Sequence, residues 1–560
     1  MSDIMKPRSF KNMLNRILSE YKKYNSIYNV KKIPVFDGNK FLDIFGEKLE
    51  SPLGIAAGPH TQLAQNLVAC YASGCRFFEL KTIQKLFGED LGIPKPCIRA
   101  EDEAYNTEWS SEFHASQASD EYIKGYILIK IIAKEFNLGD PDAFIFNISA
   151  GYDYEGVTGE IVDNFINTMM NAENNKTFNE CINDALSMVD MFENVDAEFI
   201  KNISPKISNS ITLSTMHGCP KEEIEKIALH LIENKKINTY VKLNPTLLGY
   251  DRVRKILDDC NFDYIKFGKE QFEHDIQFDD AISMIKRLKE VAKNIGVSFG
   301  VKLTNTFQTE IHNDELPGNA MYMSGKALYP LSINVAKMIS ERMDGSLPIS
   351  FSGGIDKTNV KDLYDAGVWP ITICTVLLKT PGLEAFSNVL NEIKAFDIKD
   401  QTTNTKLLID MADKSTTLMK KTEQARKKYD EHRHYSCTRS DGFRCRVLCT
   451  NCVRVCPNRT NEILEIASGK IILHVDALCN ECGNCAFPCV EPCLPYKDRI
   501  TLFSDIESFK DSENQGLYIE SLENIHYRWD NKVMNGKLSD IPEVLQEVTR
   551  GILENKPYLL

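Results

Sequence analysis

The sequence predicts an α/β protein in which a TIM-type (β/α)8 barrel is followed by a small cysteine-rich domain. Two observations lead to this fold class. Between residues 50 and 380, short apolar or β-branched runs alternate with helical stretches, and this alternation is typical of a parallel sheet. Ten of the 17 cysteines lie from Cys437 to Cys493, beyond that region.

Length and charge limit the number of domains and the kinds of partner. The 560 residues are too many for one compact core. The net charge of −13 argues against a nucleic-acid partner, because phosphate-binding surfaces carry an excess of lysine and arginine. The sequence contains neither the apolar core of a signal peptide nor about 18 consecutive uncharged apolar residues, so it predicts a cytoplasmic protein without a membrane span. The expected segments are an N-terminal helical segment (1–45), the barrel (46–390), a helical linker (391–436), the cysteine domain (437–503) and a C-terminal helical tail (504–560).

The first expected element is an amphipathic helix. We expect it to dock on the protein's own core, and a membrane or partner role is the minor alternative. Its apolar residues recur at helical spacing: Phe10, Met13, Leu14, Ile17, Leu18 and Tyr21.

Nine runs are candidates for the strands of the barrel. A (β/α)8 barrel has only eight strand positions, so one of the nine must lie outside it. The candidates are residues 53–58, 77–82, 143–149, 210–215, 240–245, 264–268, 299–306, 348–354 and 371–375.

Polar residues gather at the carboxyl ends of these strands, where barrel enzymes carry their active sites. The late runs "SGKALYP" (324–330), "SGGID" (352–356) and "TICT" (372–375) offer glycines and hydroxyls that suit a phosphate. Lys81, Lys242 and Lys302 occupy strand ends. For each lysine alone, a solvated surface charge is as good an explanation as a binding site. Together they suit a flavin, which needs a cation near N1 and O2 when it is reduced.

The cysteine domain contains a duplicated metal-binding pattern. Its first run is C-x3-C-x2-C-x3-C-P and its second is C-x2-C-x2-C-x3-C, and the last three cysteines of each run are 33 residues apart. Such runs hold two 4Fe-4S clusters, with the fourth cysteine of each run bound to the other cluster. A single zinc site is the less favoured alternative, and Cys493 or Cys437 is a possible substitute ligand. The predicted sets are Cys445, Cys449, Cys452 and Cys489 for one cluster, and Cys456, Cys479, Cys482 and Cys485 for the other.

The motifs "GIAAG", "ELKT", "KLNP", "TNT", "SGKALYP" and "SGGID" resemble the FMN barrel of dihydroorotate and dihydropyrimidine dehydrogenases. The chain is similar over nearly its whole length to the selenate reductase iron–sulfur subunit family of YgfK type, through "SPLGIAAGPHTQLAQN", "LSTMHGCP" and "CNECGNC". This resemblance implies an FMN barrel and a ferredoxin-like domain with two 4Fe-4S clusters. The implied FMN site comprises Ala57, Gly58, Lys81, Thr82, Asn147, Lys242, Lys302, Asn305, Thr306, Ser324, Gly325, Gly353, Gly354, Cys374 and Thr375, with Lys242 and Lys302 as alternatives for the flavin lysine.

Catalytic residues follow from the same resemblance. The superfamily places a proton-transferring serine or cysteine just after the fourth strand, and aligning "LSTMHG" on this motif points to Thr215. Cys219 is the rival, because a thiol is a more acidic donor than a hydroxyl. Tyr105, Asn106 and Glu108 are substrate candidates in the segment after the second strand.

Three functions remain open from the sequence. The leading one is an oxidoreductase in which two clusters pass electrons from an external partner to FMN, which acts on an activated double bond of a small substrate. The partner is then a flavoprotein subunit with FAD and NAD(P)H, or a ferredoxin, because no G-x-G-x-x-G fingerprint follows a strand. The alternatives are a non-catalytic electron-transfer subunit of a larger reductase and an iron–sulfur module without flavin.

Overall fold

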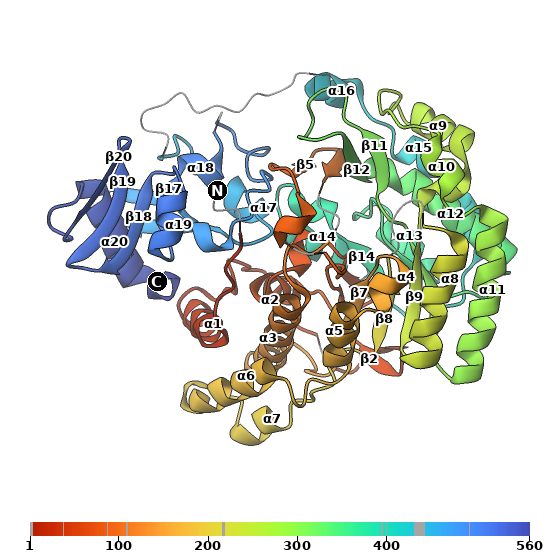
Figure 1. The fold of residues 1–560 in the computed structure, drawn as a ribbon, viewed down its shortest axis with the longest axis horizontal. Coiled ribbons are helices and arrows are strands. Elements are labelled where there is room, and N and C mark those ends of the chain that lie inside the picture. Colours follow the sequence, from red (N-terminus) through yellow and green to blue (C-terminus); the bar gives the residue numbers. More distant parts are fainter. Residues whose placement is uncertain are drawn as a thin grey trace.

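A closed barrel of eight parallel strands forms the centre of the molecule (Figure 1). The computed structural model describes residues 4–36, 38–86, 88–107, 110–214, 219–393, 396–398, 400–430, 443–491 and 493–560. Around the barrel the strand order is β10-β13-β14-β3-β4-β7-β8-β9. The strands are β3 (Leu53–Ile55), β4 (Phe77–Glu79), β7 (Ile145–Ala150), β8 (Ser210–Leu213), β9 (Asn238–Leu243), β10 (Phe299–Leu303), β13 (Ile349–Phe351) and β14 (Ile371–Ile373).

The predicted (β/α)8 barrel is confirmed, and eight of the nine candidate runs supply its strands. The ninth candidate, residues 264–268, lies outside the barrel in an irregular segment beside β11 (Phe307–Glu310), where Glu310 donates a backbone hydrogen bond to Lys266. Burial explains the difference. The barrel strand β10 is buried at every residue, whereas Ile265 and Phe267 are buried and Lys266 is exposed. Such alternation suits a segment with one face in solvent, not a parallel barrel strand.

Helices cover the outside of the barrel because each has one apolar face. In α11 (Phe278–Ile295), the buried residues Ile282, Ile285 and Leu288 recur at helical spacing, and Gly296 ends the helix in the left-handed region at φ 86°. The other covering helices are α2 (Ala64–Ala72), α3 (Ala115–Glu135), α4 (Tyr154–Thr158), α5 (Glu160–Met170), α6 (Lys176–Ser187), α7 (Ala197–Lys201), α8 (Lys221–Leu229), α9 (Tyr250–Asp259), α10 (Glu270–His274), α12 (Tyr329–Arg342), α13 (Val360–Asp365), α14 (Glu384–Ile393), α15 (Thr405–Leu418) and α16 (Glu423–Asp430).

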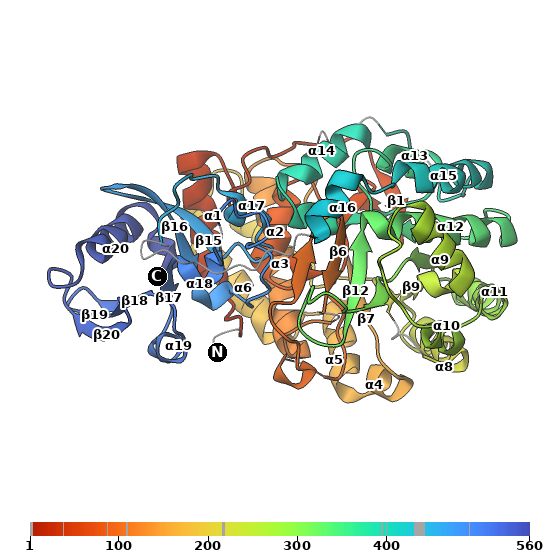
Figure 2. The ribbon, with the colours of Figure 1, turned by 90° about the horizontal axis from the view of Figure 1, so that it is seen from above.

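Two small sheets close the ends of the barrel. The hairpin β1 (Leu42–Ile44) and β2 (Glu47–Leu49) precedes the first barrel strand. A four-stranded antiparallel sheet, here called the lid sheet, has the order β11-β12-β6-β5 and is built from insertions after β4 and β10 (Figure 2). Its strands are β5 (Ile98–Ala100), β6 (Glu103–Asn106), β11 and β12 (Ala320–Gly325).

The small domain lies beside the barrel and contains a six-stranded mixed sheet (Figures 1 and 2). The prediction of a helical tail over 504–560 is wrong, because three strands in this range extend the sheet. Asp530 and Asn531, both with positive φ, form the tight turn between the last two strands. The elements are α17 (Asn451–Val455), β15 (Asn461–Ile466), β16 (Gly469–Val475), α18 (Pro495–Asp498), β17 (Ile500–Phe503), α19 (Ile506–Asp511), β18 (Gly516–Ser521), β19 (Asn524–Trp529), β20 (Lys532–Gly536) and α20 (Glu543–Asn555).

The N-terminal helix α1 (Phe10–Tyr24) joins the two parts of the molecule. Its apolar face is buried, including Met13, Leu14 and Ile17, and the helix contacts the barrel helices α3 and α6 as well as the end of the chain. Its Arg16 forms an ion pair with Glu462 of β15. Across the described part of the chain, no helix combines the length and apolar character needed to cross a membrane.

Candidate functional site

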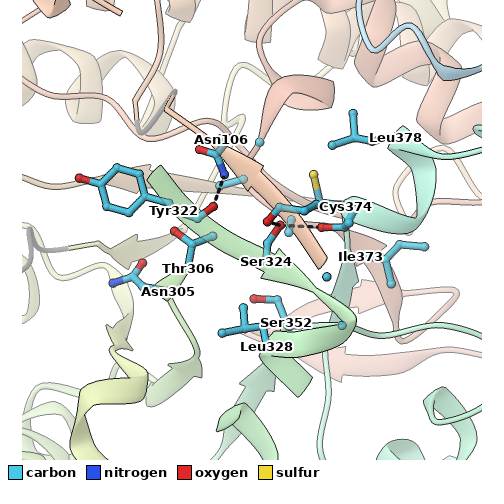
Figure 3. Close-up of a pocket in the computed structure, with 18 of the residues that line it drawn as sticks. Asn106, Asn305, Thr306, Tyr322, Ser324, Leu328, Ser352, Ile373, Cys374 and Leu378 are labelled. Atoms are coloured by element: carbon cyan, nitrogen blue, oxygen red, sulfur yellow. Dashed lines mark hydrogen bonds between the residues drawn. The ribbon is translucent and has the colours of Figure 1, made fainter. Parts of the chain in front are cut away.

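A cavity of about 650 Å³ lies at the carboxyl ends of the barrel strands, with the lid sheet forming one wall (Figure 3). The residues that directly follow β3, β4, β10, β13 and β14 line it, as the barrel fold predicts. Fifteen of the residues proposed from the sequence lie on its wall. They are Ala57, Gly58, Lys81, Thr82, Tyr105, Asn106, Lys242, Asn305, Thr306, Ser324, Gly325, Gly353, Gly354, Cys374 and Thr375.

Three glycines give one end of the cavity a backbone surface without side chains. Gly325, Gly353 and Gly354 all have positive φ. A Cβ on Gly354 would lie 2.5 Å from the carbonyl oxygen of Gly325, and one on Gly353 would lie 2.6 Å from the Ser332 hydroxyl. Ser324 and Thr375 add hydroxyls that are 2.9 Å apart (Figure 3). Exposed backbone N–H groups and hydroxyls in a glycine-lined concavity are what a phosphate group requires.

A buried ion triad lies at the base of the cavity. Glu79, on β4, accepts Lys242 of β9 at 2.9 Å and Lys302 of β10 at 3.0 Å, one lysine on each carboxylate oxygen. Lys242 lines the cavity, whereas Lys302 is 1% exposed and bonds Ser350 and Thr372 within the barrel. The two lysines are neighbours in the β9–β10 register, so only their side-chain directions distinguish them. Lys242 is therefore the lysine that can touch a ligand.

A chain of amides holds Asn305 in one orientation. Asn244 donates to Asp275 at 2.9 Å, and because a carboxylate only accepts, the amide oxygen of Asn244 faces Asn305. Asn305 donates to that oxygen at 2.7 Å and accepts a hydrogen bond from Ser214 at 3.2 Å. The chain presents Asn305 at the cavity wall in a defined orientation (Figure 3).

Besides Lys302, two of the proposed residues that the structure describes, Asn147 and Cys219, are not on the cavity wall. Asn147 is 1% exposed and donates to Thr212 at 2.7 Å, because its side chain points along the neighbouring strand. Cys219 is buried beside Glu223, with its sulfur 3.9 Å from a carboxylate oxygen. Burial and Glu223 raise the pKa of Cys219 to about 12, so its thiol is a poor proton donor. Thr215 and Glu108 lie outside the described residues.

The lid sheet supplies cavity residues that the sequence interpretation missed. Gln308 and Tyr322 line the wall beside Asn106, which donates to the backbone oxygen of Tyr322 at 3.4 Å (Figure 3). Asn106 and Tyr322 belong to strands, because β6 and β12 pair directly. The alternation in "EAYN" and "AMYMSG" was a strand signal in the sequence.

Other missed residues lie at the two ends of the cavity. Ser214 follows β8, the fourth barrel strand, and its hydroxyl is on the wall. Lys326 and Lys379 line the glycine-rich end together with Asp102 and Asp356. These charged side chains belong to no sequence motif. Only their position near the strand ends indicated that they line the site.

The eight duplicated cysteines fall into two groups. The inner cysteines, Cys456, Cys479, Cys482 and Cys485, line one small cavity in the small domain. The other four, Cys445, Cys449, Cys452 and Cys489, are here called the outer cysteines, and Cys445 and Cys452 pack in one cluster with Cys479 and Cys485. The structure thus brings Cys456, the fourth cysteine of the first run, to the first three cysteines of the second run.

Two further cysteines were proposed as substitute ligands. Cys493 is fully buried, with its sulfur 3.9 Å from Glu491, and Cys437 lies outside the described residues. Within the described ranges, no three His, Cys, Asp or Glu side chains meet as ligands of one metal ion. The ligands of a cubane bind four different irons, so they need not meet at one point.

The inner cysteines adjoin the barrel cavity. The backbone oxygen of Cys482 accepts hydrogen bonds from Cys97 at 3.1 Å and Ile98 at 3.0 Å. Cys482 also packs with Ile98 and Leu378, and both of these residues line the cavity. Cys482 therefore belongs to the same packed cluster as two residues of the cavity wall.

Comparisons with known proteins give a consistent assignment. The family described as oxidoreductase YgfK, N-terminal TIM-barrel domain, matches residues 28–429. The YgfK proteins of Escherichia coli strain K12 and of E. coli O157:H7 are each 44% identical to the chain over 411 residues, which is 71% of this chain. The chain spans 40% of the length of these two relatives.

Solved structures show a more distant likeness. Ligand-free DHODH from Eimeria tenella has a TM-score of 0.42 at 14% identity and covers 70% of this chain and 98% of its own. DHODH from E. tenella in complex with ferulenol has a TM-score of 0.40 at 15% identity and covers 68% of this chain and 89% of its own.

Proposed function

Because the chain belongs to the oxidoreductase YgfK N-terminal TIM-barrel family, we propose that it is an FMN- and iron–sulfur-dependent oxidoreductase. In this proposal, two 4Fe-4S clusters relay electrons between an external partner and FMN in the barrel cavity. The substrate is a small heterocyclic or carbonyl-conjugated molecule with an activated double bond, which is reduced or oxidised.

The cavity wall supports FMN as the ligand. Gly325, Gly353 and Gly354 line the cavity and would hold the phosphate through backbone N–H groups. A side chain at any of them would collide with neighbouring atoms and disturb this end of the cavity. Lys242 would supply the cation that a reduced flavin needs. When bound, FMN supplies hydride exchange with the substrate and single-electron exchange with a cluster.

Residues of the lid sheet would bind the substrate. Asn106, Gln308 and Tyr322 present polar groups from the lid, opposite the strand ends that carry Asn305. Ser214 is the described hydroxyl after the fourth strand, where a proton-transfer group is expected, and its hydrogen bond to Asn305 orients it. Closure of the cavity by the lid would exclude water from the reacting atoms.

The two cysteine groups support the clusters. The inner group combines three cysteines of the second run with the fourth of the first, which is the ligand pattern of one cluster in a two-cluster ferredoxin. The outer cysteines lie beside exposed Val447 and Val490, which suits the side at which an electron carrier docks.

One observation carries the proposal: Cys482, an inner cysteine, packs on Ile98 and Leu378 of the cavity wall. This arrangement has no evident purpose in a barrel that only binds a ligand or in an isolated iron–sulfur module. It suits a protein in which a cluster and a cavity-bound flavin exchange electrons.

The first test is the flavin and iron content of the anaerobically purified protein, with the released flavin identified. About one FMN and about eight iron atoms per chain are expected for one barrel site and two clusters. Iron without flavin would overturn the proposal and favour an electron-transfer subunit. Flavin without iron would contradict the proposed electron relay through two clusters.

Replacing an inner cysteine tests the relay itself. Cys482→Ser should strongly slow flavin reduction by a reduced electron carrier while bound FMN stays in place, because the affected cluster adjoins the cavity. Stopped-flow absorbance of the flavin measures this rate. Cys181→Ser, which changes a buried cysteine of α6, is the matched control and should leave the rate unchanged. Loss of FMN from Cys482→Ser with unaltered electron transfer would contradict the relay.

A further inference from the structure

The triad of Lys242, Glu79 and Lys302 contains three ionised groups in the interior of the barrel. Lys302 and Glu79 are each 1% exposed at the side chain, and Lys242 is 10% exposed. Removing charges from water is costly, and apolar replacement of buried ion pairs is often neutral or stabilising. The fold alone therefore does not explain why this group is present.

The charge of the triad follows from its geometry. Burial raises the pKa of Glu79, but Lys242 and Lys302 outweigh this effect and lower the pKa to about 2, so Glu79 is a carboxylate. Burial lowers the pKa of Lys302 to about 8, so Lys302 is cationic at pH 7. Two lysines and one carboxylate leave the triad a net charge of +1.

We propose that Lys302 is a positioning residue that sets the charge presented by Lys242 to the flavin, an inference that rests on the proposed function. Glu79 holds Lys242 in place but would by itself neutralise it. Lys302 occupies the second carboxylate oxygen at 3.0 Å and compensates that negative charge. Lys242 thereby keeps an effective positive charge at the cavity wall.

The surroundings of Lys302 support a role in charge rather than in ligand contact. Its other partners are the hydroxyls of Ser350 at 3.1 Å and Thr372 at 2.6 Å, which are neutral. Glu79 of β4, Lys242 of β9, Ser350 of β13 and Thr372 of β14 face it from the strands around it. Among the described residues that line the cavity, Lys302 does not occur.

The test is sulfite binding to the oxidised holoprotein. Sulfite adds reversibly to oxidised flavin and leaves it negatively charged, so its affinity reports the positive charge near the flavin. Lys302→Met should keep FMN but bind sulfite roughly tenfold more weakly, because one nearby charge is lost in a poorly screened interior. Lys286→Met, at an exposed position of α11, is the control and should bind sulfite as the native protein does.

A double variant distinguishes charge from structural damage. In Glu79→Gln/Lys302→Met the negative and the positive charge are removed together, and Lys242 alone supplies the net +1. The sulfite affinity should return to within a few-fold of the native value. Continued weak binding by the double variant, with full FMN content, would overturn the inference.

The native protein provides a measurement that needs no variant. Below about pH 8 Lys302 is protonated and the triad carries +1; above it the triad is neutral and stabilises a reduced, anionic flavin less. The flavin midpoint potential should therefore fall more steeply with pH above about 8. If the potential shows no such change, or if flavin-loaded Lys302→Met binds sulfite as the native protein does, the inference is overturned but the proposed function is not. Native protein without any flavin would overturn the proposed function as well.

Discussion

Gly354 exemplifies how a single residue determines what the cavity can hold. Its φ of +65° lies in the left-handed region, and an added Cβ would approach the carbonyl oxygen of Gly325 to 2.5 Å and Tyr329 Cβ to 2.8 Å. Backbone atoms cannot move aside as a flexible side chain can. Alanine here would therefore distort the phosphate end of the cavity.

Gly354→Ala should greatly reduce the FMN content of the purified protein, because its Cβ collides with Gly325 and Tyr329 and so distorts the glycine-lined end of the cavity. Gly296→Ala is the matched control: its φ is +86° and no atom lies within 4 Å of an added Cβ. Gly296→Ala should lose roughly 1 kcal/mol of unfolding free energy from backbone strain, Gly354→Ala should lose more because of its clash, and only Gly354→Ala should lose flavin. Released flavin and chemical denaturation measure the two effects. Equal flavin content in both variants would show that the glycine end does not hold the phosphate.

At the scale of elements, α1 is attached to β15 by buried charges. Arg16 of α1 lies 2.5 Å from one carboxylate oxygen of Glu462, and Lys556, just after α20, lies 2.5 Å from the other. Burial alone would raise the pKa of Glu462, but Arg16 and Lys556 lower it to about 2. Three segments far apart in the sequence are thus joined at one carboxylate.

Glu462→Gln should cost about 3–5 kcal/mol of unfolding free energy at pH 7, because it leaves Arg16 and Lys556 buried without their anion. The folded-state pKa of Glu462 is depressed, so its stabilisation is complete above the ordinary glutamate pKa of about 4.3 and is lost as the pH falls toward about 2. As the pH falls from about 4.3 to about 2, the unfolding free energy of the variant should therefore decrease less than that of the native protein. Denaturant unfolding at several pH values measures both effects.

Glu465→Gln on the same strand is the control for this experiment. Glu465 pairs with Lys470 at 2.6 Å, but both side chains are 54% exposed. Solvent screens such an exposed pair, so its loss should change stability far less than the loss of Glu462. A similar loss in both variants would show that the Glu462 pairs do not hold α1 in place.

At the scale of the whole molecule, glycines allow the small domain to pack closely on the barrel. A Cβ on Gly382 would lie 2.0 Å from the backbone oxygen of Arg454, and one on Gly483 would lie 2.4 Å from Pro96 Cβ. Asn484 adds hydrogen bonds of 3.0 Å to Leu378 and 2.9 Å to Val455, one in each part. The separation between the inner cysteines and the cavity depends on this close packing.

Gly382→Ala should slow flavin reduction by a reduced electron carrier while the FMN and iron contents remain native, because the added Cβ forces the small domain away from the barrel. Gly249→Ala is the control, with a φ of +79° and no atom within 4 Å of an added Cβ. Stopped-flow measurements on both variants give the comparison. Native rates in Gly382→Ala would mean that the close packing is not needed for electron transfer.

The sequence by itself determined the features that short-range patterns carry. Alternating strands and helices indicated the barrel, because a fully buried strand is a short apolar run bounded by polar ends. Those polar ends located most of the cavity wall, since parallel strands bring their carboxyl ends together. Cysteine spacing also predicted that Cys456 joins Cys479, Cys482 and Cys485, which line one small cavity in the structure.

Only the tertiary structure decided features that depend on partners distant in the chain. Asn106 and Tyr322 are 216 residues apart, and no local pattern indicates that β6 and β12 pair to form the lid sheet. Lys242 and Lys302 have the same local sequence, VKL, and their roles separate only because Glu79, Ser350 and Thr372 hold Lys302 inside the barrel. Periodicity records which face of a segment is buried, but it does not record what that face contacts, and side-chain direction in a packed interior is set by those contacts.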